Sequence, residues 1–234
     1  MRAMSVPQGP WGSAVSYFSM IKRLVAIVMA VLVAAACGGP GSTSGAKGPT
    51  ASSVAVQSSD LPAGMVKCDL SGDIDSFLSK EKNQDQGTYK STSTDWEALK
   101  NGGATAGFTS FYADNAAHCT AIKSSGYDIG TASYKLAVNF VTQFKDEKSA
   151  ANAYANDSIF GFKTSQLRTG GLGLTEGTAT GLTASSIVIS APISNQYFYI
   201  AMWQNKTFVV ILAILNVDAA ASKKVAALEN GRIK

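Results

Sequence analysis

The sequence predicts an α+β domain, built as an antiparallel β-sheet with helices packed on one face and preceded by a signal peptide and a disordered linker. Several segments alternate apolar and polar residues with a period of two, which is typical of half-buried antiparallel strands. Other segments follow a capping aspartate and show the apolar stripe of an amphipathic helix. Because strands and helices occur in blocks along the chain, a two-layer arrangement is expected.

The first part of the domain is expected to be helical. Asp73 precedes an apolar stripe and predicts the start of a short helix, which a polar loop over residues 83–93 follows. Thr94 and Glu97 have the spacing of a capping box, so a second short helix is expected over 95–100, ended by the glycines that follow.

Strands are expected near residues 105–112 and over 134–144. In the second strand the apolar residues occupy every other position, while Asn139 and Gln143 lie between them and are expected to face water. Asp146 then precedes an alanine-rich stretch and predicts a helix.

The C-terminal part carries the strongest strand signals. A glycine-rich loop over 170–181 leads to a strand core at 187–189, which Pro192 is expected to end. Residues 197–203 and 207–215 are expected to form a tight hairpin, and the second of these strands is apolar on both faces, which predicts a central place in the sheet.

A last helix is expected after Asp218, with Val225 and Leu228 facing the sheet and Glu229 facing water. The strands at 134–144 and 207–215 are each followed by an aspartate and an alanine-rich helix. Both helices are therefore expected on the same face of the sheet.

The N-terminus has the layout of a secretory signal peptide. Lys22 and Arg23 precede an apolar run over 24–36, which is too short to span a membrane, and small residues come before Cys37. Residues 1–36 are therefore expected to be an N-terminal extension and signal peptide that take no part in the fold.

The end of this segment, Ala34-Ala35-Ala36-Cys37, resembles the lipobox of bacterial lipoproteins, although Ala34 stands where leucine is usual. The resemblance implies that Cys37 carries lipid, with acyl chains such as palmitate, and becomes the first residue of a mature chain held at the cell membrane and facing outside the cytoplasm. The alternative is cleavage by ordinary signal peptidase, which also accepts Ala34-x-Ala36 and would release a soluble protein.

Residues 37–59 are rich in Gly, Ser, Thr, Pro and Ala and are expected to be a flexible tether. One globular domain is expected over 60–234. Three of the 20 basic residues precede Cys37 and none of the 16 acidic residues does, which leaves 17 basic against 16 acidic side chains in the mature chain. A nucleic-acid partner is therefore not expected.

The three cysteines are Cys37, Cys68 and Cys119. An odd number of cysteines in an exported protein leaves one thiol over, and lipidation of Cys37 would account for it. Cys68 and Cys119 are then expected to form a disulfide. No CxxC motif occurs and His118 is the only histidine, so neither a metal site nor a cofactor is expected.

No residue set in the sequence specifies catalysis. No GxSxG motif surrounds a serine, and the acidic residues from Asp69 to Asp75 lack the glycine and glutamate of a calcium loop. An enzyme would have to use carboxylates such as Asp69, Asp73 or Asp114.

Tyr197, Tyr199 and Trp203 share one face of a predicted strand, with Phe198 opposite. Such a stripe is either core or, if the face is open, a ligand-binding surface. The sequence favours a non-enzymatic, lipid-anchored module that binds or senses an unknown small ligand. The alternatives are an envelope lipoprotein that interacts with other proteins and a carboxylate-based enzyme.

Overall fold

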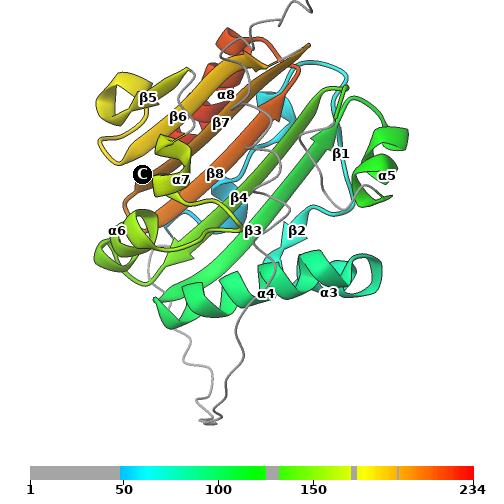
Figure 1. Cartoon of the computed structure of the whole chain (residues 1–234). Helices are drawn as coiled ribbons and strands as arrows, with labels where there is room; N and C mark the ends of the chain where they lie inside the picture. The colour runs from blue at the N-terminus through cyan, green and yellow to red at the C-terminus, as the bar shows by residue number, and fades with distance from the viewer. Residues whose placement is uncertain (1–47, 125–131, 170–172, 194) are drawn as a thin grey trace, which may run out of the picture. The chain divides into compact units, whose positions relative to one another are not determined.

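A computed structural model describes residues 48–124, 132–169, 173–193 and 195–234. Its centre is an antiparallel sheet with the strand order β1-β3-β4-β8-β7-β6-β5, in which β2 also pairs with β3 (Figure 1). The predicted α+β class with an antiparallel sheet is confirmed. The strands are β1 (Val66–Lys67), β2 (Gly72–Asp73), β3 (Ala104–Ala113), β4 (Leu136–Phe144), β5 (Leu174–Glu176), β6 (Ser186–Ile193), β7 (Gln196–Asn205) and β8 (Phe208–Leu215).

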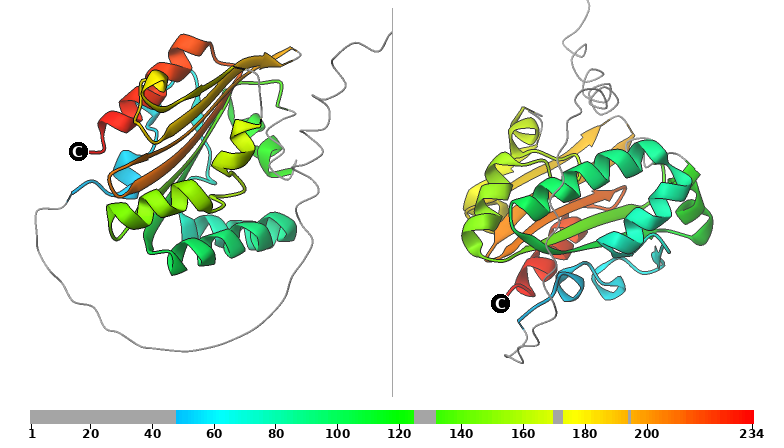
Figure 2. Two further views of the ribbon diagram at one scale, coloured as in Figure 1. Left: turned by 60° about the vertical axis from the view of Figure 1, so that its left-hand side comes forward. Right: turned by 90° about the horizontal axis from the view of Figure 1, so that it is seen from below.

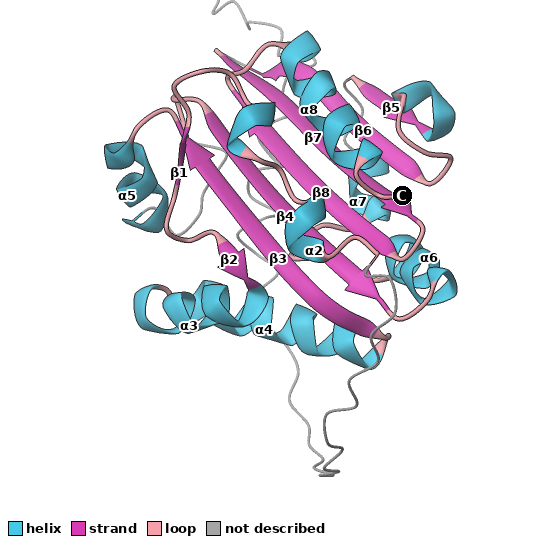
Figure 3. Ribbon diagram, turned by 180° about the vertical axis from the view of Figure 1, so that it is seen from behind, coloured by secondary structure: helices cyan, strands magenta, loops and turns pink. Residues whose placement is uncertain are grey.

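Helices cover both faces of the sheet, where the sequence predicted one. Helices α3, α4, α6 and α7 lie on one face and α2 and α8 on the other, as Figure 2 and the reverse view in Figure 3 show. The helices are α2 (Ala51–Val54), α3 (Ile74–Gln84), α4 (Gln86–Asn101), α5 (Ala116–Ser124), α6 (Glu147–Asn156), α7 (Thr164–Arg168) and α8 (Ala219–Gly231), with short 3₁₀ helices η2 (Ser58–Asp60) and η4 (Gly177–Thr180).

The two central strands explain this double covering. Every residue of β8 is buried, as its uniformly apolar sequence predicted. In β4, Gln143 alone is not fully buried, and Asn139 is 0% exposed. The expectation that Asn139 faces water is wrong, because the α2 and α8 layer covers that face.

The two strand-to-helix units place their helices on opposite faces, not on the same face. Helix α6 packs Ala150 and Ala153 into the core on the α3 and α4 face, whereas α8 packs Val225 and Ala226 into the core on the α2 face. Two residues separate β4 from α6 and three separate β8 from α8. In the second of these connections Asn216 has a positive φ of 57°, so the chain turns there and does not continue in the direction of β8.

The long helix α4 replaces a predicted loop and a short helix. It begins at Gln86 because the Asp85 carboxylate accepts hydrogen bonds from Gly87 N at 2.9 Å and Thr88 N at 3.1 Å. Thr94, the predicted cap, lies inside the helix and donates its hydroxyl to the Lys90 carbonyl at 2.8 Å. The helix packs Trp96 and Leu99 into the core, where their side chains are 5% and 0% exposed.

The predicted hairpin is confirmed, with β7 and β8 joined through Lys206, which has a positive φ of 49°. Pro192 does not end its strand, because β6 continues to Ile193. β5 pairs with residues 187–189 of β6, so no strand of the described residues pairs with Pro192 on that side.

The domain begins earlier than the sequence predicted. Residues 48–59 were assigned to the linker, yet Thr50 caps α2 and the side chains of Val54 and Val56 are 0% and 1% exposed in the core. The remainder of the predicted linker and the signal peptide lie outside the described residues. Among the described residues, no helix has the length and apolar character needed to cross a membrane.

Candidate functional site

A small pocket opens on the α8 face of the sheet, between α8, η4 and the strands β5, β6 and β7. Its volume is about 180 Å³. The residues that line it are Thr175, Ala179, Thr180, Val188, Ser190, Tyr199, Ala219 and Lys223. The elements that form the pocket are therefore spread over about the last 60 residues, and no local sequence motif predicts it.

Tyr199 provides the most unusual group at this pocket. Its side chain is 2% exposed, and its hydroxyl oxygen is buried without a hydrogen-bond partner among the described residues. Burial is the main cause that raises the pKa of this hydroxyl far above its ordinary value, with smaller contributions from Tyr197 and Glu229. The hydroxyl therefore stays protonated and can donate a hydrogen bond.

Two of the other hydroxyl groups at the pocket already have partners within the protein. The Thr180 hydroxyl contacts Gly177 O at 2.8 Å and Ser186 Oγ at 2.7 Å, and the Ser190 hydroxyl is hydrogen-bonded to the hydroxyl of Tyr197. Both are thus already engaged in the protein. Lys223 is exposed on α8 and forms no ion pair with any described residue.

The chain closes tightly behind the pocket at Gly173. This residue has a φ of 67°, and a Cβ atom placed on it would lie 2.2 Å from the Ser190 carbonyl oxygen. Only glycine fits such an approach without a backbone shift. Gly173 therefore allows the chain entering β5 to approach β6 where Ser190 meets the pocket.

The aromatic stripe of β7 is mostly core. Trp203 is 0% exposed, and both Trp203 and Tyr199 belong to the apolar cluster beneath α2 and α8. Tyr197 is half-buried and packs at the edge of that cluster. An open aromatic face, the condition for the predicted binding surface, is absent from this strand, and of the three residues Tyr199 alone lines the pocket.

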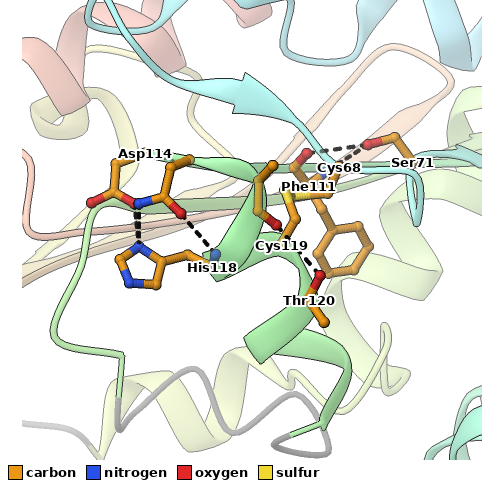
Figure 4. Close-up of a disulfide and its surroundings, with 9 residues drawn as sticks. Cys68, Ser71, Phe111, Asp114, His118, Cys119 and Thr120 are labelled. Atoms are coloured by element: carbon orange, nitrogen blue, oxygen red, sulfur yellow. Dashed lines mark hydrogen bonds and ion pairs between the residues drawn. A yellow bond between two sulfur atoms is a disulfide. The ribbon is translucent and has the colours of Figure 1, made fainter.

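The structure joins Cys68, which follows β1, to Cys119 of α5 in a disulfide with a Cα–Cα distance of 5.4 Å (Figure 4). Both cysteines are buried in the core on the α3 and α4 face. The bond closes a sequence separation of 51 residues and fixes α5 against the edge of the sheet.

His118 lies beside this disulfide and is a surface residue. Its Nδ1 atom is hydrogen-bonded to the Asp114 carboxylate (Figure 4). Its ring stacks on Tyr134 with centroids 4.0 Å apart. The exposed fractions of the His118 and Asp114 side chains are 36% and 34%. No described hydroxyl or thiol is hydrogen-bonded to His118, so the pair lacks a nucleophile partner there.

The carboxylates considered for catalysis serve separate roles. Asp73 caps α3 by accepting from Ser76 N at 2.9 Å, and this bond is the main cause that lowers the pKa of Asp73. Asp114 pairs with His118, and Asp69 is exposed. None of the three lines the pocket, and the described residues contain no group of three His, Cys, Asp or Glu side chains suited to a metal ion.

A buried polar cluster ties the N-terminal arm (residues 48–61) to the sheet. The Asn139 side chain accepts from Val56 N at 3.1 Å and donates to Ile211 O at 3.0 Å and to Glu229 Oε1 at 2.9 Å. The Tyr112 hydroxyl donates to the carbonyl of Val56 at 2.9 Å. Asn139 thus connects the arm, β8 and α8 at one point.

Arg232 completes the attachment of the arm. Its guanidinium contacts both carboxylate oxygens of Asp60, at 3.1 and 2.9 Å, and donates to the carbonyls of Val54 and Ala55. A bidentate contact of this kind, between a guanidinium group and both oxygens of a carboxylate, is among the stronger ion-pair geometries. Sequence analysis missed this cluster, and the apolar run Val54-Ala55-Val56 inside the predicted linker is the one signal that pointed to it.

Glu229 occupies the centre of this cluster, although the sequence placed it in water. The face of α8 that packs on the sheet carries Ser222, Val225, Ala226 and Glu229, so Glu229 is 0% exposed and Leu228, expected inside, is 42% exposed. Burial raises the pKa of Glu229 well above its ordinary value, against the opposing effects of the Asn139 hydrogen bond and the Arg232 charge.

Replacing Glu229 with glutamine is expected to flatten the pH dependence of stability. Because burial raises the folded-state pKa, the contribution of Glu229 to stability is complete below its unfolded pKa and is lost as the pH rises through the folded pKa. Glutamine keeps the oxygen that Asn139 donates to and cannot ionise. Urea unfolding at about pH 5 and about pH 8 should show a smaller loss of stability for E229Q than for the unaltered protein.

The matched control is Glu97→Gln, because Glu97 is exposed and forms an exposed ion pair with Lys100. It should leave the pH dependence unchanged. Identical pH profiles for E229Q and the unaltered protein would show that Glu229 does not carry this effect.

No known protein family matches the chain, and no curated protein is significantly similar to it. Among solved structures, the chain is similar to the extracellular domain of PknH from Mycobacterium tuberculosis, with a TM-score of 0.34 and 9% sequence identity. The match covers 58% of this chain and 69% of that chain. A TM-score this low does not establish a shared fold.

Proposed function

We propose that the protein is a lipid-anchored extracytoplasmic module that binds a small ligand and does not transform it. The observation that carries the binding role is the pocket itself, which combines the apolar side chains of Ala179, Val188 and Ala219 with the amino group of Lys223.

The cysteine pairing supports the anchored location. Cys68 and Cys119 form the disulfide, which leaves Cys37 as the odd cysteine that lipidation accounts for. A disulfide is also typical of proteins in oxidising compartments outside the cytoplasm. The Gly-, Ser- and Pro-rich sequence after Cys37 has the composition of a flexible tether, which a lipid-anchored domain needs.

The size of the pocket limits the ligand. Sites for drug-sized ligands measure about 300–1,000 Å³, whereas this pocket measures about 180 Å³. A ligand that fits it is a small molecule or one end of a larger one. No observation favours the protein-interaction alternative, because the large hydrophobic side chains exposed in the described part are Val66 and Leu228, one on β1 and one on α8.

A fragment screen tests the binding role. The mature full-length chain, labelled for methyl NMR, is mixed with acidic, neutral and basic fragments smaller than about ten non-hydrogen atoms. Binding should shift the methyl signals of Ala179, Val188 and Ala219 together, and the fragment should be recovered unchanged. If fragments of every charge class leave these three signals in place, the proposed binding role is wrong.

A further inference from the structure

We propose that the outer surface of α8 docks on the anionic lipid headgroups of the membrane to which Cys37 would anchor the chain. This inference rests on the anchored location in the proposed function and adds which side of the domain faces the lipid. It follows from the charge of α8, from an exposed leucine on it and from the place where the chain enters the domain.

The exposed side of α8 is basic. Lys223 and Lys224 are exposed, whereas Glu229, the one acid within the helix, is buried. Asp218, the acid just before the helix, is its N-cap and accepts from Ala221 N at 2.8 Å. The helix therefore presents positive charge outward, and an anionic surface is the complementary partner.

The longer helices on the opposite face of the sheet differ from α8, because each of them exposes charges of both signs. The pairs are Asp75 and Lys82 on α3, Lys90 and Glu97 on α4, and Glu147 and Lys148 on α6. Opposite charges side by side oppose each other at an anionic surface. Among these four helices, α8 alone exposes charges of a single sign.

The loop between β7 and β8 extends the basic surface. Lys206 in this loop is exposed, and the side chain of the neighbouring Asn205 donates to Asn230 of α8 at 2.8 Å. The loop therefore lies beside the C-terminal end of α8. Leu228, four residues after Lys224, is 42% exposed near that end. An apolar side chain among lysines suits the boundary between headgroups and acyl chains.

The chain enters the domain at the same end of α8. The carbonyl of Pro49, the second described residue, accepts from the Gln143 side chain at 3.4 Å. Gln143 pairs with Phe208, which follows Lys206 by two residues. Helices α2 and α8 also lie on one face of the sheet (Figure 3). Since ten residues separate Cys37 from the described domain, an acylated Cys37 would keep this end of α8 close to the membrane.

Attachment through Cys37 makes a weak contact sufficient. One lysine near an anionic surface strengthens binding about fivefold, so three lysines and one leucine would hold a free domain only weakly. A tether makes the contact intramolecular and raises the effective concentration of the lipid around the domain. The docked domain is therefore expected only when it is attached to the membrane.

The test attaches the oxidised mature chain, residues 37–234, to lipid nanodiscs. A maleimide lipid reacts with Cys37, the cysteine outside the disulfide. The discs contain either phosphatidylcholine alone or an equal mixture of phosphatidylcholine and phosphatidylglycerol. A gadolinium-labelled lipid broadens the NMR signals of methyl groups that lie near the bilayer.

The methyl signals of Ala220, Ala227 and Leu228 report on the outer surface of α8, and those of Ala151 and Ala155 report on exposed residues of α6. In the mixed discs the α8 signals should broaden more than the α6 signals. This difference should be lost in phosphatidylcholine alone and at high salt, because it depends on charge.

Two matched double variants locate the docking surface. Lys206→Gln with Lys224→Gln should lower the ratio of docked to free domain about tenfold or more. Lys223 is left in place because it also lines the pocket. Lys82→Gln with Lys90→Gln removes the same charge from exposed positions on the opposite face and should have no effect. Both variants should melt at the temperature of the unaltered protein, since only exposed residues change.

Three results would overturn the inference. They are equal or stronger broadening on α6 in the mixed discs, the same α8 broadening in both kinds of disc, and equal effects of the two double variants. Because the lipid is attached chemically, none of these results depends on acylation in the cell. An unacylated natural chain would remove the proposed anchor, whereas the nanodisc result decides separately whether α8 docks on anionic lipid.

Discussion

Removal of the Cys68–Cys119 disulfide is expected to lower the free energy of unfolding by about 4 kcal/mol. The bond closes a loop with a sequence separation of 51 residues, and in the chain-entropy model a closure of that length restricts the unfolded chain by about this amount. The variant replaces both cysteines with alanine, so that no free thiol remains. Urea unfolding of the variant and the unaltered protein gives the difference directly.

Reductant provides the matched control for this experiment. The unaltered protein should lose about the same stability when it is reduced, whereas the double-alanine variant should not respond to reductant at all. A variant as stable as the oxidised protein would show that the disulfide does not support the fold.

Replacement of Asn139 with alanine is expected to cost about 3–4 kcal/mol, because each buried group left without its partner costs about 1–3 kcal/mol. The change leaves Val56 N, Ile211 O and Glu229 Oε1 without the amide that they contact. It also leaves a cavity at a residue that is 0% exposed. Hydrogen exchange at Val56 should accelerate, since its amide loses the acceptor that holds the N-terminal arm.

Gln143→Ala is the control for this substitution. Gln143 lies on the same face of β4, is only half-buried, and reaches the Pro49 carbonyl at 3.4 Å. It should cost less than about 1 kcal/mol, which is typical of a weak and partly exposed contact. Equal losses for the two variants, or unchanged exchange at Val56 in Asn139→Ala, would mean that the amide does not hold the arm.

Local patterns were sufficient for much of the fold. Asp73, Asp146 and Asp218 cap helices as predicted, because the interaction of a carboxylate with the first amides of a helix depends on a few neighbouring residues. The uniformly apolar strand at β8 is central, as predicted, because both of its faces must be covered. The disulfide was predicted from the number of cysteines and from the export that the N-terminal sequence indicates.

Long-range contacts account for what the sequence did not predict. Val56 and Asn139 are 83 residues apart, and the apolar run Val54-Ala55-Val56 indicates a buried segment without indicating that it packs on β4. In α8, Leu228 and Glu229 are neighbours, so a small rotation of the predicted apolar stripe exchanges the buried residue for the exposed one. The pocket draws on β5, η4, β6, β7 and α8, and its lining could be assembled only after these elements were placed.

The central claim is that this domain acts outside the cytoplasm while it is held to a membrane through Cys37. The most direct test is the intact mass of the protein extracted from membranes. The mass is measured with a thiol-alkylating label before and after reduction. The predicted result is a chain that begins at Cys37, carries added acyl mass, takes up no label until it is reduced and then takes up label at Cys68 and Cys119. A chain recovered from the medium without acyl mass, with Cys37 labelled before reduction, would contradict the anchored location.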